Sequence, residues 1–195
     1  MNAVARWEAN ARGRLQQVAI DLYSEHGFEQ TTVAEIAQRA GLTQRTFFRY
    51  FADKREVLFW GEDALHELVA LAVRGAAEAA TPLEAVAAAL KPAVTIFFEQ
   101  RPREQVRQRH EVIAANEALQ ERELAKLARL ATGVATALRS RGATEATARL
   151  AAETGVVILK IAVERWISDT TDRDLPRHID DAFDDLRALL GPTDG

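Results

Sequence analysis

The chain has 195 residues, of which 48% are hydrophobic and 28% are charged, a composition typical of soluble globular proteins. It contains no cysteine, which excludes disulfide bonds and thiolate metal sites and suits a reducing cytoplasm. No apolar run is long enough to cross a bilayer, and residues 1–8 lack the apolar core of a signal peptide. We therefore expect a cytoplasmic protein, with no membrane association, that forms one large domain or two small ones.

The net charge of −4 is unevenly divided along the chain. Residues 1–56 carry eight Lys or Arg against seven Asp or Glu, so the negative excess lies in the remainder. Basic side chains gather between residues 45 and 55, a local basic face of the kind that DNA binding needs. Three further arginines lie near the N-terminus: Arg6, Arg12 and Arg14. These could form a basic N-terminal arm or belong to a solvated tail.

The segment from Thr31 to Leu58 predicts two short helices joined by a tight turn. Thr32 and Glu35 have the spacing of a capping box, so the first of these helices should begin at Val33. The apolar residues that follow recur at helical spacing and predict one buried face: Val33, Ile36, Ala37 and Ala40.

Gly41 stands where a helix C-cap needs a left-handed backbone, and Thr43 is a suitable N-cap for the next helix. The aromatic side chains of this second helix recur at the spacing of a buried face: Phe47, Tyr50 and Phe51. Asp53 and Glu56 again have capping-box spacing, which predicts a further helix from Lys54. Two short helices joined by a turn that contains glycine are typical of a DNA-binding helix-turn-helix.

The exposed side of the second helix carries side chains that can read DNA. Gln44 can bond adenine and Arg45 guanine, and Thr43 and Phe48 can contact a thymine methyl group. Side chains around this helix tip suit phosphate contacts: Thr31, Thr32, Tyr50 and Lys54. The candidate DNA-binding residues are Thr31, Thr32, Thr43, Gln44, Arg45, Thr46, Phe48, Arg49, Tyr50 and Lys54. A plain three-helix bundle would explain the buried aromatic residues but not this polar tip.

Beyond Leu58 every segment predicts helix, and none alternates as a strand does. The expected helices cover residues 54–79, 81–100, 102–115, 117–141, 144–168 and 176–190. The fold class is therefore all-α, with about nine helices. We expect a three-helix helix-turn-helix domain over residues 1–56 and a larger helical domain over residues 57–195.

The segment from Thr31 to Leu58 resembles the TetR family of bacterial transcription regulators, whose pattern is roughly T-x-x-x-I-A-x-x-A-G-[VL]-[ST]-x-x-T-[FL]-[YF]-x-[YH]-F-x-x-K-x-x-L. The residues at the expected offsets are Thr32, Ile36, Ala37, Ala40, Gly41, Leu42, Thr43, Thr46, Phe47, Phe48, Tyr50, Phe51, Lys54 and Leu58. The preceding residues that fit the family's first helix are Leu15, Val18, Ala19, Leu22, Gly27 and Phe28. At Phe48 the family commonly has tyrosine, so this chain lacks the hydroxyl that could contact a phosphate there.

The resemblance implies a ligand-binding C-terminal domain and a homodimer that binds a palindromic operator in double-stranded DNA. In the family the last two long helices pair across a two-fold axis, and here these are residues 144–168 and 175–190. Both segments carry more apolar side chains than one core face needs, Val157 and Ile161 among them. Burial in the core of a monomer would also account for these side chains.

The resemblance further places a small-molecule pocket among the fourth to eighth helices. The candidate ligand-binding residues are Phe59, Trp60, Phe97, Phe98, Arg107, His110, Ile113, Leu127 and Trp166, with Leu130 beside them. Plain core packing would explain each apolar member equally well.

The sixth helix is rich in arginine. Its charges either form a solvated face paired with Glu104, Glu111 and Glu117 or hold an anionic group at the pocket mouth. Such a helix resembles one actinobacterial branch of the family, typified by mycofactocin-biosynthesis regulators, which are thought to sense acyl-CoA thioesters. A long fourth helix would join the helix-turn-helix to the pocket. We therefore expect a repressor in which the effector moves the sixth helix against the fourth and releases DNA.

Two other functions compete with this one: an enzyme, and a regulator that is controlled by a protein partner. His-Glu pairs at residues 66–67 and 110–111 begin like a zinc-protease motif, but Ala70 and Ala114 stand where the second histidine is required. There is no glycine-rich phosphate loop and no serine elbow, so we expect no catalytic residue, metal or cofactor. A regulator controlled by a protein partner is the other alternative, and its pocket would be filled by its own side chains.

Overall fold

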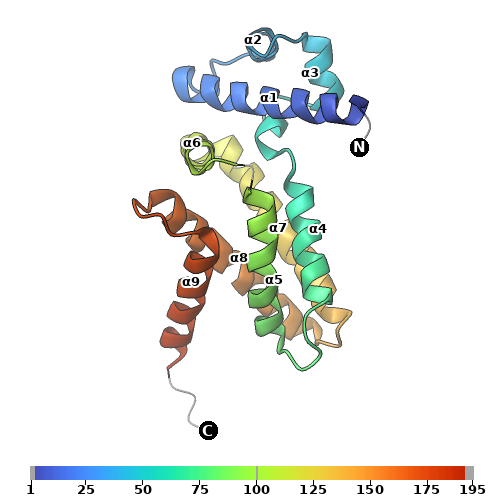
Figure 1. The fold of residues 1–195 in the computed structure, drawn as a ribbon, viewed down its shortest axis with the longest axis vertical. Helices are drawn as coiled ribbons and strands as arrows, with labels where there is room; N and C mark the ends of the chain where they lie inside the picture. Colours follow the sequence, from blue (N-terminus) through green and yellow to red (C-terminus); the bar gives the residue numbers. More distant parts are fainter. Residues whose placement is uncertain (1–2, 100, 192–195) are drawn as a thin grey trace. The chain divides into compact units, whose positions relative to one another are not determined.

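The computed structural model describes the backbone of residues 3–99 and 101–191, and the side chains from Ala11 onward within those ranges. This part of the chain forms nine α-helices and one short 3-10 helix, with no strand. Figure 1 shows the helices in chain order, and the expected all-α fold is confirmed. Within the described residues, no helix is both long and apolar enough to span a lipid bilayer.

The chain forms two compact units, each made of two stretches of sequence. The first comprises residues 1–62 and 103–123, and the second comprises residues 63–102 and 124–195. The unit that holds the helix-turn-helix is therefore larger than residues 1–56, because a segment from the middle of the chain joins it. Helical periodicity cannot show this, since it depends on which faces pack together in three dimensions.

The first unit contains α1, α2, α3, the 3-10 helix η1, α6 and the start of α7. Their bounds are Ala3–His26 for α1, Val33–Arg39 for α2, Gln44–Tyr50 for α3, Glu56–Phe59 for η1, Arg103–Ala114 for α6 and Glu117–Arg139 for α7. The largest fully buried side chains of this core are Leu15, Ile20, Ile36, Phe47, Leu58 and Leu119. Val112 and Ile113 from α6 belong to the same cluster, so α6 is part of the scaffold that holds α3.

The local signals of the helix-turn-helix form as the sequence predicted. The Thr32 hydroxyl accepts a hydrogen bond from the Glu35 N–H at 3.2 Å, and the Glu35 carboxylate accepts one from the Thr32 N–H at 2.8 Å. Gly41 has a φ of 67°, and the Thr43 hydroxyl accepts from the Thr46 N–H at 3.2 Å. The turn between α2 and α3 is thus stabilised by its own residues.

The expected continuous helix over residues 54–79 is wrong. The chain instead forms η1, breaks at Trp60 and Gly61, and resumes as α4 over Glu62–Arg74. Asp53 does start a turn, since its carboxylate accepts two hydrogen bonds from backbone N–H groups at 2.7 and 3.2 Å. Gly61 then has a φ of 85°, a left-handed conformation that ends the helical run at no steric cost to glycine. The single long lever expected from the sequence therefore does not form.

The second unit contains most of α4, the remainder of α7, and three further helices. These are α5 at Pro82–Phe98, α8 at Glu145–Ser168 and α9 at Leu175–Leu190. Each of these three packs against the other two. A Cβ added to Gly155 on α8 would lie 2.3 Å from Cγ1 of Val86 on α5, so glycine is what allows these two helices to approach so closely. Thr81 and Glu84 form a capping box at the start of α5, close to the expected start of this helix.

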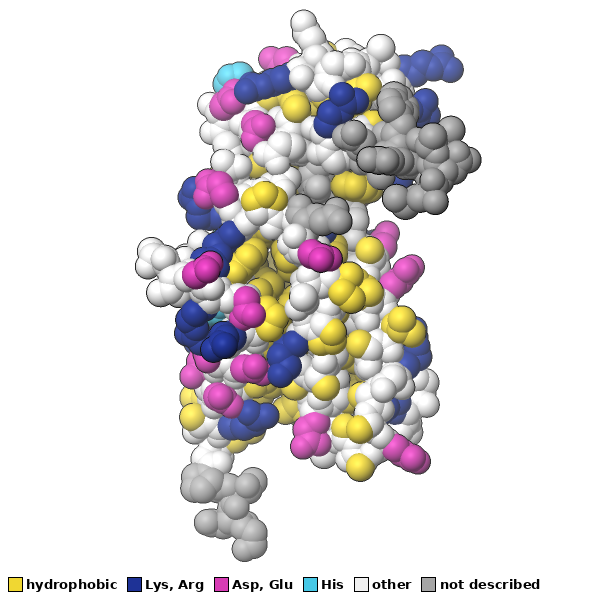
Figure 2. Space-filling view, viewed as in Figure 1, with side chains coloured by type: hydrophobic (Ala, Val, Ile, Leu, Met, Phe, Trp, Pro, Cys, Tyr) yellow, Lys and Arg dark blue, Asp and Glu magenta, His cyan; other side chains and the backbone are white. Residues whose placement is uncertain are grey.

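The helices predicted to form a dimer interface each have a buried side and exposed apolar residues. On α8, Leu159 is buried, whereas Leu150 and Val157 are 71% and 55% exposed. On α9, Phe183 is buried, whereas Leu189 is 84% exposed. In the view of Figure 2, the hydrophobic side chains of the second unit gather mainly over α4 and α5, so the exposed residues of α8 and α9 are additional to that surface. The core of this unit therefore leaves apolar surface on both helices uncovered.

Candidate nucleic-acid interface

The recognition helix α3 presents the side chains that the sequence predicted for base reading. Gln44 and Arg45 are exposed, and neither has a side-chain partner among the described residues. Phe48 is 54% exposed, whereas Phe47 on the opposite side is fully buried. The exposed side of α3 therefore offers an amide, a guanidinium and an aromatic ring, groups that can contact base edges in the major groove of DNA.

The threonines of the interface are exposed in part but engaged in capping. Thr43 and Thr46 share a hydrogen bond between their hydroxyls at 3.0 Å. The Thr32 hydroxyl lies 2.8 Å from a Glu35 carboxylate oxygen. Their contacts to DNA stay predictions, and any such contact would compete with these local bonds.

Tyr50, at the C-terminal end of α3, is flanked by two arginines. Arg49 donates a hydrogen bond to the Tyr50 hydroxyl at 2.6 Å, and its guanidinium carbon lies 4.7 Å from the ring centroid. Arg12 places its guanidinium carbon 4.9 Å from the same centroid. Arg12 and Arg14 are both on α1, so they belong to a helix and not to an extended tail. The side chain of Arg6 lies outside the described residues.

Thr31 is not available to a phosphate. Its side chain is buried, with 1% exposure, and its hydroxyl donates to the carbonyl oxygens of Gly27 at 2.9 Å and Leu22 at 3.3 Å. These bonds tie the loop after α1 to the end of that helix. The predicted phosphate contact is therefore corrected: Thr31 is a structural residue.

Lys54 is also removed from the predicted phosphate contacts. Its ammonium donates to the carbonyl oxygens of Phe28 at 2.8 Å, Glu29 at 3.2 Å and Thr31 at 3.1 Å, and it lies 4.3 Å from the Phe28 ring centroid. An ammonium has three N–H donors, and all three are used here. Nothing in the sequence indicates that three carbonyls of the α1–α2 loop converge on this side chain.

Tyr23 completes this arrangement from the other side. Its hydroxyl donates to the Lys54 carbonyl oxygen at 2.6 Å. Burial, and after it the nearby Asp53 charge, raises the pKa of the Tyr23 phenol.

The loop after α1 and the end of α6 line a cavity of about 230 Å³. It is smaller than most ligand pockets. The cavity is lined by Tyr23, Gly27, Phe28, Glu29, Gln30, Val112, Ala115 and Asn116, none of which the sequence indicated as a ligand contact.

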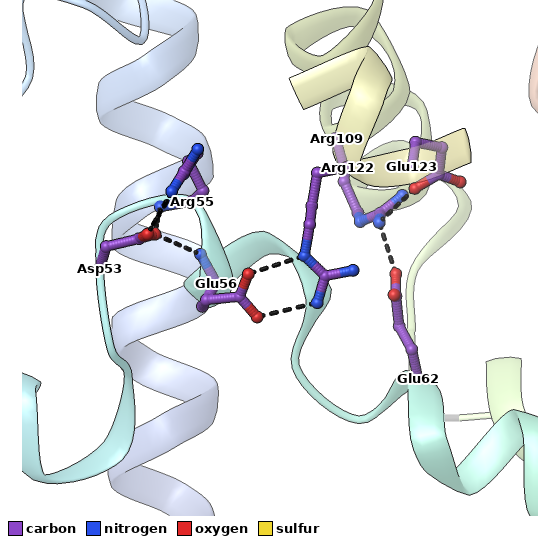
Figure 3. A network of polar contacts seen from close by, with 7 residues as sticks. All are labelled: Asp53, Arg55, Glu56, Glu62, Arg109, Arg122 and Glu123. Carbon is purple, nitrogen blue, oxygen red and sulfur yellow. Dashed lines mark hydrogen bonds and ion pairs between the residues drawn. The ribbon is translucent and has the colours of Figure 1, made fainter. Parts of the chain in front are cut away.

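Two arginines from α6 and α7 hold the segment that follows α3, as Figure 3 shows. Arg122 makes two hydrogen bonds to the Glu56 carboxylate, at 2.7 and 2.9 Å, and these bonds raise the pKa of Arg122. Both guanidinium carbons lie close to the ring of Phe59, at 5.1 Å for Arg109 and 4.9 Å for Arg122. Phe59, a predicted ligand contact, is thus a buried part of the first unit's core.

Arg109 binds one backbone carbonyl and two carboxylates, and we call this set the Arg109 junction; Figure 3 shows its bonds to the two carboxylates. It donates to the Leu58 carbonyl oxygen at 2.8 Å, to Glu62 at 2.6 Å and to Glu123 at 3.1 Å. Glu62 and Glu123 are the last residues of the first unit before the chain enters the second. The junction therefore fastens α4 and α7 at the points where both leave the helix-turn-helix unit.

The other candidate ligand residues in the first unit have separate roles. Arg107 pairs with Glu104 and Glu111 on the same exposed helix face, which matches the solvated alternative expected for these charges. This pairing removes the reason to place Arg107 at a pocket mouth. Ile113 is buried in the core of the first unit, and Trp60 and His110 are half-buried.

The remaining candidates lie in the second unit. Phe98 contacts Phe97 and Trp166, with ring centroids 4.9 and 5.6 Å apart, and Leu127 is half-buried on α7. The nine candidates are thus divided between two units, and their ligand role stays a prediction.

The sequence did not single out Lys126, which is buried in the second unit at 8% exposure. Burial, followed by the charge of Lys126, lowers the pKa of His66.

Comparison with known proteins bears on this interface. A model for bacterial regulatory proteins of the tetR family matches residues 16–59, and a model for the MftR C-terminal domain matches residues 80–191. The regulator TcmR of Streptomyces glaucescens is 42% identical over 82 residues, which are 41% of this chain and 35% of TcmR. A protein of Mycobacterium tuberculosis described as a mycofactocin biosynthesis transcriptional regulator, MftR, is 38% identical over 63 residues. That match covers 32% of this chain and 31% of MftR, so the alignments span about a third of both relatives.

Solved structures share the fold. SmeT of Stenotrophomonas maltophilia, in complex with triclosan, matches with a TM-score of 0.61 and 22% identity, over 92% of this chain and 91% of SmeT. FadR of Thermus thermophilus, in complex with lauroyl-CoA, matches with a TM-score of 0.53 and 24% identity, over 92% of this chain and 93% of FadR. The family models together cover the helix-turn-helix and most of the second unit. The chain therefore belongs to the TetR family of bacterial transcriptional regulators.

Proposed function

We propose that this protein is a cytoplasmic homodimeric repressor that binds a palindromic DNA operator and leaves it when a small hydrophobic or acyl-CoA-like effector binds. The observation that carries the DNA-binding part is the exposed surface of α3: Gln44 and Arg45 have no side-chain partner among the described residues, and the Phe48 ring is 54% exposed. These side chains lie on a helix whose other side is anchored by Phe47 in a well-packed core. Such a rigid support is what base discrimination requires.

The effector part rests on the second unit. The cluster of Phe97, Phe98 and Trp166 offers aromatic surface for an apolar group. The structural neighbours SmeT and FadR were solved with triclosan and lauroyl-CoA, respectively. Both ligands have a large apolar part, which supports an effector of this class.

The Arg109 junction supplies a route from the effector to the DNA. An effector can release DNA only if it prefers a conformation that docks poorly. One guanidinium, that of Arg109, binds both Glu62 and Glu123, and it also binds the Leu58 carbonyl oxygen in η1. A shift of α4 or α7 in the second unit therefore acts on η1, the next helical element after the helix-turn-helix. This route replaces the single long helix that the sequence suggested.

The base-reading proposal is tested with Gln44→Ala and Arg45→Ala. Each should weaken the preferred operator by roughly 1–3 kcal/mol and relax selectivity at defined base pairs, while binding to random duplex DNA is unchanged. The operator is obtained by selection from random duplexes, and affinity is measured on single-base variants. Gln38→Ala, an exposed glutamine on α2, is the matched control and should leave selectivity at every position unchanged. Equal losses on all sequences from Gln44→Ala and Arg45→Ala would contradict base reading by α3.

The dimer is tested by native mass spectrometry of the purified protein. We expect a dimer, and Val157→Glu should convert it to a monomer, because it places a charge on the exposed apolar side of α8. Leu71→Glu, a change at an equally exposed leucine on α4, should leave the dimer intact. A monomer of the unmodified protein, or dissociation by Leu71→Glu alone, would refute the α8–α9 interface. Additional mass on the dimer would identify the effector directly.

A further inference from the structure

We propose that Arg12, Tyr50 and Arg49 form a binding site for a DNA backbone phosphate, separate from the base-reading end of α3. We call these three residues the Arg-Tyr-Arg cluster. The inference rests on the proposed DNA binding. It joins Tyr50, a predicted phosphate contact, to Arg12 of α1, which the sequence offered only as part of an N-terminal arm or a solvated tail. It also changes the role of Arg49, from a residue of the recognition surface to a phosphate ligand.

The geometry brings two cations to one aromatic ring. The guanidinium carbons of Arg12 and Arg49 lie 4.9 and 4.7 Å from the Tyr50 ring centroid. Arg49 is further oriented by its 2.6 Å hydrogen bond to the Tyr50 hydroxyl. The ring attracts both guanidinium groups through its π-face and so reduces the freedom that each would lose on binding a ligand.

The charge of this cluster is not neutralised by any of the described side chains. No carboxylate among the described side chains pairs with Arg12 or Arg49, whereas Arg39 and Arg122 each lie within 2.7 Å of a carboxylate oxygen. Each guanidinium therefore keeps a positive charge that a phosphate oxygen can neutralise. The buried Nε of Arg12 also has no hydrogen-bond partner among the described residues, so one donor is left for a ligand or water.

A phosphate fits this cluster better than a base edge does. Bases are read from the N-terminal end of a recognition helix, whereas Arg49 and Tyr50 lie at the C-terminal end of α3 and Arg12 comes from α1. A guanidinium presents a planar fork of donors that matches two phosphate oxygens. Thr31 and Lys54 are engaged internally, so this cluster supplies the phosphate contact that those two residues do not.

The test is the salt dependence of DNA binding by the full-length protein. The logarithm of the binding constant is measured against the logarithm of KCl concentration, on the selected operator and on a scrambled duplex. Arg12→Met keeps an unbranched apolar side chain against Tyr50 and removes the charge. It should make the slope shallower by roughly 0.9 for each subunit and weaken both duplexes by the same factor. Arg49→Met should do the same.

Two controls separate charge from packing. Arg12→Lys keeps the charge and should retain the slope of the unmodified protein. Arg14→Met removes an exposed charge two residues further along α1, on roughly the opposite side of that helix, and should leave the slope unchanged.

The proposal is overturned by any of three results: an unchanged slope in Arg12→Met, a loss confined to the operator, or an equal slope change in Arg14→Met. Weaker binding at an unchanged slope would assign Arg12 to packing of α1 against α3. Failure of the unmodified protein to bind any duplex selectively would instead overturn the proposed function. These outcomes are distinguishable in one set of titrations.

Discussion

Replacing Lys54 with methionine should destabilise the first unit and leave the salt dependence of DNA binding unchanged. The Lys54 ammonium makes three hydrogen bonds, to the carbonyl oxygens of Phe28, Glu29 and Thr31. Losing these charge-assisted bonds should cost about 3 kcal/mol, since bonds to charged groups contribute more than neutral ones but Lys54 is partly exposed. In a chain of this size that corresponds to a fall in Tm of roughly 6–12 °C.

Thermal unfolding and KCl titrations measure the two halves of this prediction. The neighbouring Arg55 is the matched control, because it is exposed and pairs with Asp53 on the surface. Arg55→Met should therefore leave Tm unchanged. A stable Lys54→Met variant whose salt slope is shallower by about 1 would show instead that Lys54 contacts a phosphate.

Replacing Arg109 with methionine should loosen the Arg109 junction and destabilise the protein by roughly 2–4 kcal/mol. This is somewhat less than the usual loss for a fully buried ion pair, because the Arg109 side chain is still 20% exposed to solvent. Glu62 is buried at 7% exposure, so its carboxylate depends on nearby positive charge. In the proposed mechanism, the same change should also reduce the effect of the effector on operator affinity, because α4 and α7 would no longer be fastened to one group.

Urea unfolding of Arg109→Met, Glu62→Gln and the double variant measures this coupling. We expect the double variant to lose at least about 1 kcal/mol less than the sum of the single losses. Arg107→Met is the control, since Arg107 is on the same helix and pairs with exposed carboxylates. If Arg107→Met and Arg109→Met were equally stable, the Arg109 junction would have no structural role.

The helix-turn-helix could be predicted in detail because its signals are local. The capping box at Thr32, the left-handed backbone at Gly41 and the cap at Thr43 each involve residues within four positions of one another. Helical periodicity also placed Phe47 in the core and Phe48 on the surface. These features depend on the backbone of one short segment, so the sequence contains all that is needed to infer them.

The errors fall where a residue's role depends on distant parts of the chain. Thr31 and Lys54 have the chemistry of phosphate contacts, but carbonyl groups of the α1–α2 region use their donors. The break at Gly61 was missed because the surrounding residues favour helix, and glycine lowers that preference only slightly.

By itself, the sequence determined the all-α fold, the helix-turn-helix and which side chains of α3 are exposed. Tertiary structure alone decided that α6 joins the helix-turn-helix unit and that Arg109 holds α4 and α7 together, while Arg107 on the same helix faces solvent. It also decided that Arg12 meets Arg49 at Tyr50. The physical reason is that helix caps and helical periodicity are properties of neighbouring residues. The partner of a long charged side chain depends instead on which helices pack together.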